Sequence, residues 1–252
     1  MTDIRARALA GETLLGVFLD LDSPLSAEIC GRAGYDWVLI DLEHGAATEA
    51  SLLAHLHAVG GTPAAALVRP PSGERLRIGR ALDLGAEGVM VPRLDTADQV
   101  HEAVGYLRYP PAGGRGVALR TRGAGLGSRG HDQVGEVNER TLGIIQIESA
   151  TAVAEADHIA AIDGVDVLFV GPTDLSHSLG VPGKFADPSY LAALDTVVAA
   201  CVRHGKSAGI LLYDSAVVAR HVELGFRFIG LGADGSFVAN GAKAILAGAG
   251  RG

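Results

Sequence analysis

Eight short apolar runs, each followed by a segment with helical periodicity, limit what this chain can fold into. The runs span residues 14–20, 37–42, 64–69, 88–92, 142–148, 165–170, 208–212 and 227–231. Continuous apolar runs of this length are typical of strands buried on both faces of a parallel sheet. The helix-period segments span residues 23–34, 48–59, 75–84, 96–107, 150–161, 188–204, 215–224 and 236–247. Repeated strand–helix alternation predicts an α/β fold, a (β/α)8 TIM barrel, with an open doubly wound sheet as the alternative.

The length and composition of the chain favour one large globular domain. Its 252 residues fit a single barrel spanning residues 1–252, and no linker rich in Pro, Ser or charge divides them. The net charge of −8 argues against a protein that binds the phosphate backbone of nucleic acid. Cys30 and Cys201 are too few and too far apart for a disulfide framework or a zinc knuckle. With neither a signal-peptide core nor an apolar run of membrane length, we expect a cytoplasmic protein.

One connection, residues 109–140, is unusually long and rich in Gly and Arg. Residues 125–130 match G-x-G-x-x-G, but no convincing strand precedes them, so the dinucleotide-binding interpretation fails its structural context. The arginines of this segment predict either a solvated mobile loop or a lid that contacts an acidic substrate. They are Arg115, Arg120, Arg122 and Arg129.

Polar residues gather where the predicted strands end. In barrel enzymes the active site lies at the carboxyl ends of the strands, so these residues are the candidates for a catalytic site. They are Asp41, Glu43, His44, Arg69, Gln146, Glu148, Gly171, Thr173, Asp174, Tyr213, Asp214 and Asp234. No lysine belongs to this set, which argues against an aldolase that forms a Schiff base.

Two carboxylates in this set have the chemistry of metal ligands. Side-chain alternation in residues 144–148 directs Gln146 and Glu148 into the barrel and the intervening isoleucines toward the helices. A buried carboxylate needs a partner, which for Glu148 is either an ion pair with Arg69 or a metal ion. Glu148 and Asp174 lie on neighbouring predicted strands and suit Mg²⁺ or Mn²⁺, with Co²⁺ or Zn²⁺ as alternatives. Asp174 could also serve as a helix N-cap.

Arg69 and His44 add a cation and a base to the same end of the barrel. Two prolines follow Arg69 and fix its direction, which is what stabilisation of a keto acid or an enolate requires; the alternative is a surface arginine on a turn. Histidine is the side chain that ordinarily gains or loses a proton near neutral pH, so His44 can act as a general base, whereas His131 and His177 are weaker candidates.

The motifs together resemble those of the HpcH/HpaI family of metal-dependent class II pyruvate aldolases. The resemblance covers nearly the whole chain and rests on VLIDLEHG, VRP, VMVPRL, RYPPAGGRG, IIQIES and VGPTDLSHSLG, which begin at residues 38, 68, 89, 108, 144 and 170. It implies a barrel of the phosphoenolpyruvate/pyruvate type.

The resemblance also implies a role for each site residue. His44 matches the catalytic base and Arg69 the arginine that stabilises the enolate, while Asp83 matches an aspartate that increases the basicity of the histidine. The matched metal ligands are Glu148 and Asp174, and the matched substrate-binding positions are Arg69, Gln146, Gly171, Thr173 and Leu212.

The implied reaction is the reversible cleavage of a 4-hydroxy-2-oxo acid to an aldehyde and pyruvate, or a close analogue such as hydroxypyruvate, through a metal-bound enolate. The resemblance further implies a homohexamer, a trimer of dimers, whose C-terminal helix at residues 236–247 packs on a neighbouring subunit. Neither nucleic acid nor a membrane is an expected partner. The alternatives are a lyase of the citrate-lyase β or malyl-CoA type, which usually has a longer chain and no histidine in this position, and a non-catalytic barrel that binds small molecules.

Overall fold

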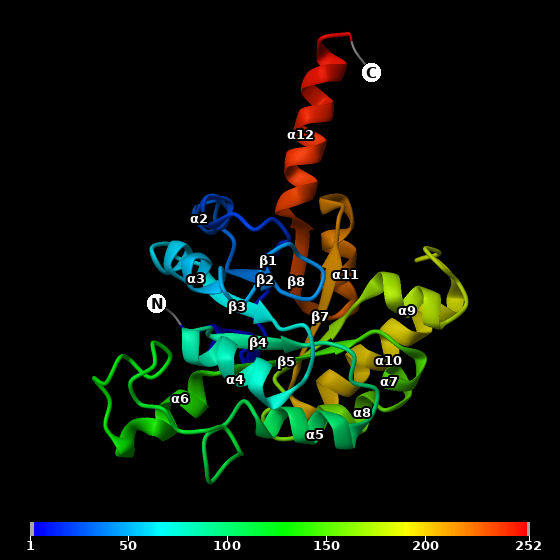
Figure 1. Ribbon diagram of the computed structural model, residues 1–252. Helices are drawn as coiled ribbons and strands as arrows, with labels where there is room; N and C mark the ends of the chain where they lie inside the picture. The colour runs from blue at the N-terminus through cyan, green and yellow to red at the C-terminus, as the bar shows by residue number, and fades with distance from the viewer. Residues whose placement is uncertain (1–2, 251–252) are drawn as a thin grey trace.

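The computed structural model describes residues 3–250, and these form a closed eight-stranded parallel barrel (Figure 1). Each strand pairs with its sequence neighbours, and β8 pairs with β1 to close the ring. The strands are β1 Leu14–Leu19, β2 Trp37–Asp41, β3 Ala65–Arg69, β4 Gly88–Val91, β5 Leu142–Ile147, β6 Val167–Val170, β7 Ser207–Leu212 and β8 Phe226–Ala233.

Helix α1 comes before β1, α12 comes after β8, and the other helices lie in the connections that return the chain from one strand to the next. The helices are α1 Ile4–Leu9, α2 Pro24–Arg32, α3 Leu52–Gly60, α4 Arg75–Leu84, α5 Ala97–Gly105, α6 Val134–Arg140, α7 Ala150–Ala154, α8 Ala156–Ala160, α9 Pro172–Ser178, α10 Pro188–His204, α11 Val218–Leu224 and α12 Asp234–Gly248. Short 3₁₀ turns, Ser215–Val217 and His131–Gln133, precede α11 and α6. None of the helices in this described part of the chain has the length and apolarity needed to cross a membrane.

All eight predicted strands are confirmed, and the doubly wound alternative is wrong because the sheet closes. Two helices, α4 and α10, have the predicted bounds. The segment predicted as one helix at residues 150–161 is two short helices, α7 and α8. Helices α1, α6 and α9 have six or seven residues, too few for a helical period to stand out in the sequence.

Two apolar layers hold the barrel together. Inside the ring, the indole of Trp37 stacks on Phe228 with ring centroids 4.6 Å apart, and Phe169 meets both rings edge-on. Outside the ring, alternate strand residues pack against the helices. In β5, Ile144 belongs to the inner layer and Ile145 to the outer one, which confirms the predicted alternation.

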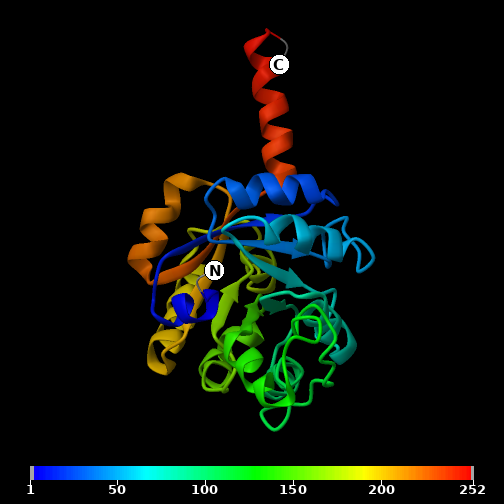
Figure 2. The ribbon, with the colours of Figure 1, turned by 90° about the vertical axis from the view of Figure 1, so that its left-hand side faces the viewer.

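The long connection between α5 and β5 lies at the amino end of the barrel, in green in Figures 1 and 2. Arg115 is buried, contacts the ring of Tyr109 and pairs with Asp83 near the end of α4. Arg122 donates to the carbonyl oxygens of Leu56 and Leu84. These two arginines therefore fasten the connection to the end of the barrel opposite the carboxyl ends of its strands.

The C-terminal helix α12 stands away from the barrel (Figures 1 and 2). Asp234 at its start is its only buried residue. Its large apolar side chains are exposed, namely Phe237, Val238, Ile245 and Leu246.

The close approach of β1 to the aromatic core gives a test of the packing. A Cβ atom at Gly16 would lie 1.9 Å from Trp37 Cδ2, whereas a Cβ at Gly79 in α4 would meet nothing within 4 Å. We expect Gly16→Ala to lower the free energy of unfolding by about 3 kcal/mol through overpacking. Gly79→Ala should raise it by about 0.5–1 kcal/mol, because alanine has the higher helix propensity.

Urea unfolding followed by tryptophan fluorescence and circular dichroism would measure both changes. Equal midpoints for the two variants would contradict this account of the core.

Candidate active site

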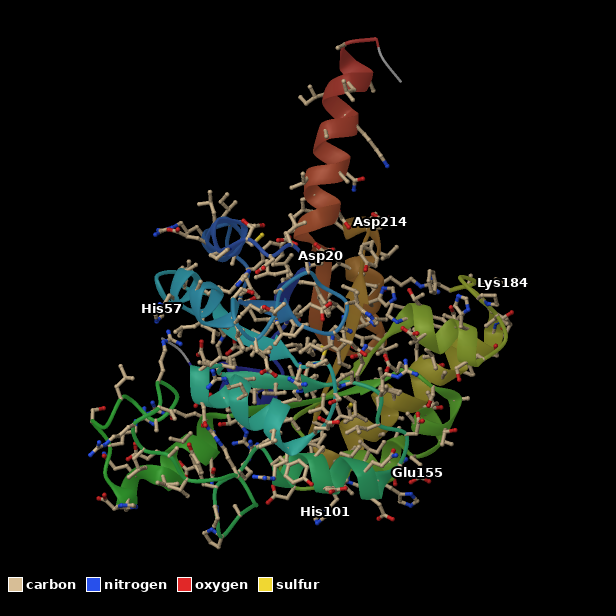
Figure 3. The ribbon with its side chains drawn as sticks, viewed as in Figure 1. Asp20, His57, His101, Glu155, Lys184 and Asp214 are labelled. Atoms are coloured by element: carbon tan, nitrogen blue, oxygen red, sulfur yellow. The ribbon has the colours of Figure 1, made fainter. Side chains whose placement is uncertain are left out.

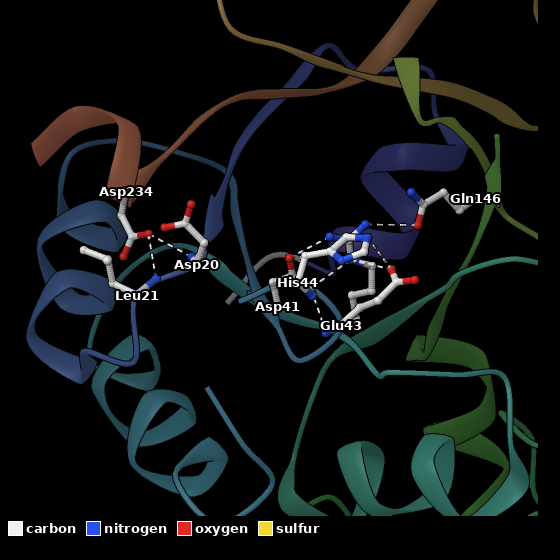
Figure 4. A network of polar contacts seen from close by, with 8 residues as sticks. Asp20, Leu21, Asp41, Glu43, His44, Gln146 and Asp234 are labelled. Atoms are coloured by element: carbon white, nitrogen blue, oxygen red, sulfur yellow. Dashed lines mark hydrogen bonds and ion pairs between the residues drawn. The ribbon is translucent and has the colours of Figure 1, made fainter. Parts of the chain in front are cut away.

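The carboxyl ends of β2 to β6 carry a continuous arc of polar residues. Asp41, Glu43 and His44 belong to the end of β2, Arg69 ends β3, and Arg93 follows β4. Gln146 and Glu148 belong to the end of β5, and Thr173 and Asp174 follow β6. Figure 4 shows the first part of this arc, with Asp41, Glu43, His44 and Gln146 close to one another. The structure therefore brings together most of the residues that the sequence singled out.

The centre of the arc is a buried, two-point contact between Asp41 and Arg69. Arg69 Nε donates to Asp41 Oδ1 at 2.9 Å, and Arg69 Nη2 donates to Asp41 Oδ2 at 2.6 Å. The two residues are register partners on adjacent strands. Arg69 Nη1 also donates to Gln146 Oε1 at 3.3 Å, and the guanidinium lies over the ring of Phe18. Arg69 is only 6% exposed, so the surface-turn alternative is wrong.

The charges around Arg69 keep it protonated. Burial lowers the pKa of the guanidinium, but the hydrogen bonds and charge of Asp41, with the charges of Glu43 and Glu148, raise it further, so its pKa lies above the ordinary value. Glu148 contributes no ion pair to Arg69, whose ion-pair partners are Asp41 and Glu43. The predicted pairing of Arg69 with Glu148 is therefore not the one in the structure.

Glu43 and His44 form the outer part of the β2 end. The Glu43 side chain is 8% exposed, and its Oε2 lies 3.3 Å from Arg69 Nε without hydrogen-bond geometry. Burial raises the pKa of Glu43, and the charges of Arg69 and His44 oppose that rise. His44 has an exposed side chain whose Nε2 lies 3.8 Å from Glu43 Oε2. His44 is thus open to solvent and to a small molecule entering the mouth of the barrel.

Glu148 is a buried carboxylate with one oxygen left for a ligand. Its Oε1 accepts a hydrogen bond from the backbone N–H of Arg93 at 3.0 Å. Burial, together with the charges of Glu43 and Asp174, raises the pKa of Glu148. A Cβ atom at Gly171 would lie 3.2 Å from Glu148 Oε2 and 3.0 Å from Gln146 Nε2. Glycine at this position therefore keeps these two polar side chains accessible.

The turn after β6 begins a short helix. Gly171 is the N-cap of α9, and Asp174 lies in the first turn of that helix, so the N-cap alternative for Asp174 is wrong. Gly171 donates its N–H to the carbonyl of Ile147 at 3.1 Å. The amide of Thr173 lies in the first helical turn, where N–H groups have no partner within the helix. Of the two expected carboxylate-binding amides, that of Thr173 is therefore the one available.

The residues fit a hard divalent cation held by few protein ligands. Glu148 and Asp174 come from the ends of neighbouring strands and supply carboxylate oxygens, and their mutual repulsion favours a positive ion between them. Residues 3–250 contain no group of three or more His, Cys, Asp or Glu side chains placed to hold a metal. This donor set resembles that of Mg²⁺ or Mn²⁺ sites, which retain water or substrate oxygens in the remaining positions.

Two of the expected site residues, Asp83 and Leu212, lie outside the arc of polar residues within a single copy of the chain. Asp83 accepts a hydrogen bond from Arg115 at 2.7 Å, near the end of α4 at the amino end of the barrel. It therefore does not contact His44 of the same chain. Leu212 belongs to the outer apolar layer, not to the inner one. It lines a mostly apolar cavity of about 350 Å³ that also includes Thr173 and Tyr213.

A second polar cluster joins β1 to α12. Asp234 Oδ1 accepts from the backbone N–H groups of Asp20 and Leu21 (Figure 4). Its Oδ2 accepts from the hydroxyl of Ser26. Asp20 in turn accepts from the N–H of Gly235. Burial and the neighbouring Asp234 raise the pKa of Asp20. This cluster fixes the point where the barrel closes.

Lysine is absent from the arc, as the sequence indicated. Lys184 lies in the connection between α9 and α10 (Figure 3), and Lys206 precedes β7. Lys243 lies on the protruding part of α12.

Asp41 is recognisable in the sequence as a polar residue at a strand end but without a role, and Arg93 is not recognisable there as a site residue. The signal for Asp41 was present, because it and Arg69 have opposite charges and end adjacent predicted strands. Arg93 has a φ of 58°, a left-handed backbone conformation that a sequence does not reveal at a non-glycine residue.

Comparisons with known proteins show which proteins this chain is similar to. The family model described as HpcH/HpaI aldolase/citrate lyase matches residues 14–241. A hydroxypyruvate/pyruvate aldolase of Agrobacterium fabrum is 36% identical over 94% of this chain and 90% of its own. A 4-hydroxy-2-oxo-heptane-1,7-dioate aldolase of Salmonella arizonae has the same identity and coverage. The crystal structure of an HpcH/HpaI aldolase/citrate lyase family protein from Burkholderia cenocepacia superimposes with a TM-score of 0.93 at 36% identity, over 99% of both chains.

The buried ion pair gives a test of the site's architecture. Asp41→Ala would leave the Arg69 guanidinium buried without its two-point partner, so we expect the free energy of unfolding to fall by about 3 kcal/mol. The double variant Asp41→Ala/Arg69→Met should lose less than the sum of the two single changes, because it removes both charges. Urea unfolding of the three variants and the parent measures this coupling; strictly additive losses would contradict it.

Proposed function

Because this chain belongs to the HpcH/HpaI aldolase/citrate lyase family, we propose that it is a divalent-metal-dependent pyruvate aldolase. The enzyme is an aldehyde-lyase. The proposed reaction is the reversible cleavage of a 4-hydroxy-2-oxo acid to an aldehyde and pyruvate, or a close analogue such as hydroxypyruvate. The observation that carries the proposal is the buried Arg69 guanidinium, held by Asp41 and Gln146 beside the carboxylates of Glu43 and Glu148.

Glu148 and Asp174 are the proposed metal ligands. Mg²⁺ or Mn²⁺ suits their oxygen atoms best, and Co²⁺ or Zn²⁺ is the alternative. When bound, the cation supplies a Lewis acid that polarises the keto group of the substrate. The hydrogen bond from the Arg93 N–H to Glu148 Oε1 orients this carboxylate and leaves Oε2 free for the ion.

Arg69 is the proposed stabiliser of the enolate. Its orientation is fixed before substrate arrives, since Asp41 accepts two hydrogen bonds along one edge of the guanidinium and Phe18 covers one face. A preorganised, buried cation stabilises developing negative charge more strongly than a solvated one. Gln146 contacts Arg69 and is the proposed substrate-binding amide, while the Thr173 N–H is the proposed donor to the substrate carboxylate.

His44 is the proposed base, acting through a water molecule. Its exposed imidazole can take a proton from the methyl group of pyruvate and return it to solvent. Asp83 can support this histidine only from a second copy of the chain, because within one copy it lies at the opposite end of the barrel. Leu212 is proposed to contact the aldehyde acceptor, because it lines the same cavity as Thr173.

A homohexamer in the cytoplasm completes the proposal. The exposed apolar side chains of α12 need a partner, and a neighbouring subunit is the one that the family resemblance predicts. Cys30 and Cys201 are both free and buried, which suits a reducing compartment.

Deuterium uptake at the methyl group of pyruvate in D₂O, followed by NMR, tests the reaction without a choice of aldehyde. We expect exchange with Mn²⁺ or Mg²⁺ and none with EDTA. His44→Ala should slow the exchange about 10²–10⁴-fold, the usual contribution of a general base. Arg69→Ala should lose exchange while remaining folded by circular dichroism, and Glu148→Gln should also weaken Mn²⁺ binding measured by calorimetry.

The alternatives give different results in the same experiment. Absence of exchange with every divalent ion would exclude the aldolase proposal and favour an acyl-CoA lyase or a non-catalytic barrel. Exchange that persists in EDTA would exclude the metal. Full activity of Glu148→Gln without added metal would remove Glu148 from the metal site.

The role of α12 in assembly can be tested separately. Ile245→Asp combined with Leu246→Asp places two charges on the exposed apolar part of this helix. We expect light scattering after size exclusion to report a hexamer for the parent and a smaller species for the variant. An unchanged mass would show that the interface does not use this surface.

A further inference from the structure

One strand of the active-site arc carries a side chain to which the proposed reaction gives no part. The end of β2 supplies the proposed base, and the end of β3 supplies the arginine that stabilises the enolate. The end of β5 supplies the substrate-binding amide and one metal ligand, and the end of β6 supplies the other metal ligand. Between these strands, β4 ends at Val91 and is followed by Pro92 and Arg93. In the proposed site, Arg93 acts only through its backbone N–H, which donates to Glu148 Oε1.

The conformation of Arg93 is unusual and local. Its φ of 58° is one of two positive values among the non-glycine residues of the described chain. A left-handed backbone costs free energy for a residue with a Cβ atom, and such residues are concentrated at functional sites. The N–H of this residue is fixed on Glu148 Oε1 at 3.0 Å, so the side chain also starts beside the proposed metal site.

The guanidinium of Arg93 is exposed and free to bind a ligand. Within residues 3–250 it makes no hydrogen bond and no ion pair. Arg69 differs in this respect, because its Nε and Nη2 donate to Asp41 and its Nη1 donates to Gln146. The arc thus holds one arginine that is fixed by hydrogen bonds to the protein and one, Arg93, whose guanidinium makes none within the described residues.

The charges of the arc indicate which kind of substrate the Arg93 guanidinium would favour. Asp41, Glu43, Glu148 and Asp174 are acidic, and only Asp41 is fully paired by Arg69. These carboxylates repel a substrate that carries a second negative charge beyond its 2-oxo acid group. The charge of Arg93 acts on both Glu43 and Glu148, so it lies where it can offset that repulsion.

We propose that Arg93 determines acceptor specificity by binding a carboxylate at the far end of the aldehyde. The preferred acceptors are then aldehydes that carry a carboxylate, and the preferred cleavage substrates are 4-hydroxy-2-oxo dicarboxylic acids. This inference rests on the proposed function, since it concerns the aldehyde half of the same reaction. A guanidinium and a carboxylate can pair through two hydrogen bonds, which gives direction as well as charge.

The test compares two acceptors of equal chain length in aldol addition with pyruvate. Succinic semialdehyde carries a terminal carboxylate and butanal carries a methyl group instead. The measured quantity is the ratio of their kcat/KM values with Mn²⁺ present, from product formation followed by NMR. We expect the parent to favour succinic semialdehyde, and Arg93→Met to reduce this ratio about tenfold, the size of one charge-assisted hydrogen bond. High salt should reduce the ratio in the parent.

Two control variants separate specificity from general effects of charge. Arg93→Lys keeps the positive charge and should retain part of the preference. Arg80→Met makes the same change in net charge on the exposed surface of α4, where Arg80 has no hydrogen bond or ion pair within the described chain, and it should leave the ratio as in the parent. Circular dichroism of each variant checks the fold.

The outcomes distinguish this inference from the proposed function. Exchange of pyruvate deuterium without a preference for succinic semialdehyde, or a preference that survives in Arg93→Met, overturns the role of Arg93 alone. Loss of the preference in Arg80→Met as well would mean that net charge, and not Arg93, sets it. Absence of metal-dependent exchange in the parent overturns the reaction and this inference together. A fall of the ratio in Arg93→Met with partial retention in Arg93→Lys supports the proposal.

Discussion

The mouth of this barrel depends on the buried contact between Asp41 and Arg69. The two hydrogen bonds of this pair fix the plane of the guanidinium, and their register places it at the carboxyl ends of adjacent strands. Gln146 is then oriented by Arg69, and Glu43 is buried against it. A buried arginine without such a partner would be strongly destabilising, so the same contact that prepares the site also permits Arg69 to be there.

The buried acidic residues at the mouth of the barrel cost free energy to ionise. Burial raises the pKa of both Glu43 and Glu148, and the charge of Glu43 raises the pKa of Glu148 further. Backbone N–H groups and arginine charges reduce this cost. Arg93 does both for Glu148, through the hydrogen bond from its N–H and through the charge of its guanidinium. What repulsion is left over favours the binding of a cation between Glu148 and Asp174. Repulsion between carboxylates that destabilises the unliganded protein thus becomes a contribution to the binding of a cation.

Much of the fold could be predicted from the sequence because a parallel barrel has a strong local signal. Buried strands such as β5 and β8 are continuous apolar runs, and α4 and α10 have clear periods and glycine stops. Helices α1, α6 and α9 could not be predicted, because six or seven residues are too few for a helical period to stand out. Among the site residues, His44, Arg69, Gln146 and Glu148 are recognisable in the sequence as polar residues at strand ends, and the closed parallel barrel brings those strand ends to one mouth.

The sequence by itself determined the eightfold alternation of strand and helix, the side-chain faces of residues 144–148 and the residue types at the strand ends, because these depend on local pattern. The tertiary structure alone decided the pairing of those residues. It paired Arg69 with Asp41 and not with Glu148, and it held Asp83 at the far end of the barrel with Arg115. It also gave Arg93 a left-handed backbone beside Glu148. These outcomes depend on closure of the barrel, which sets the register between strands that are distant in sequence.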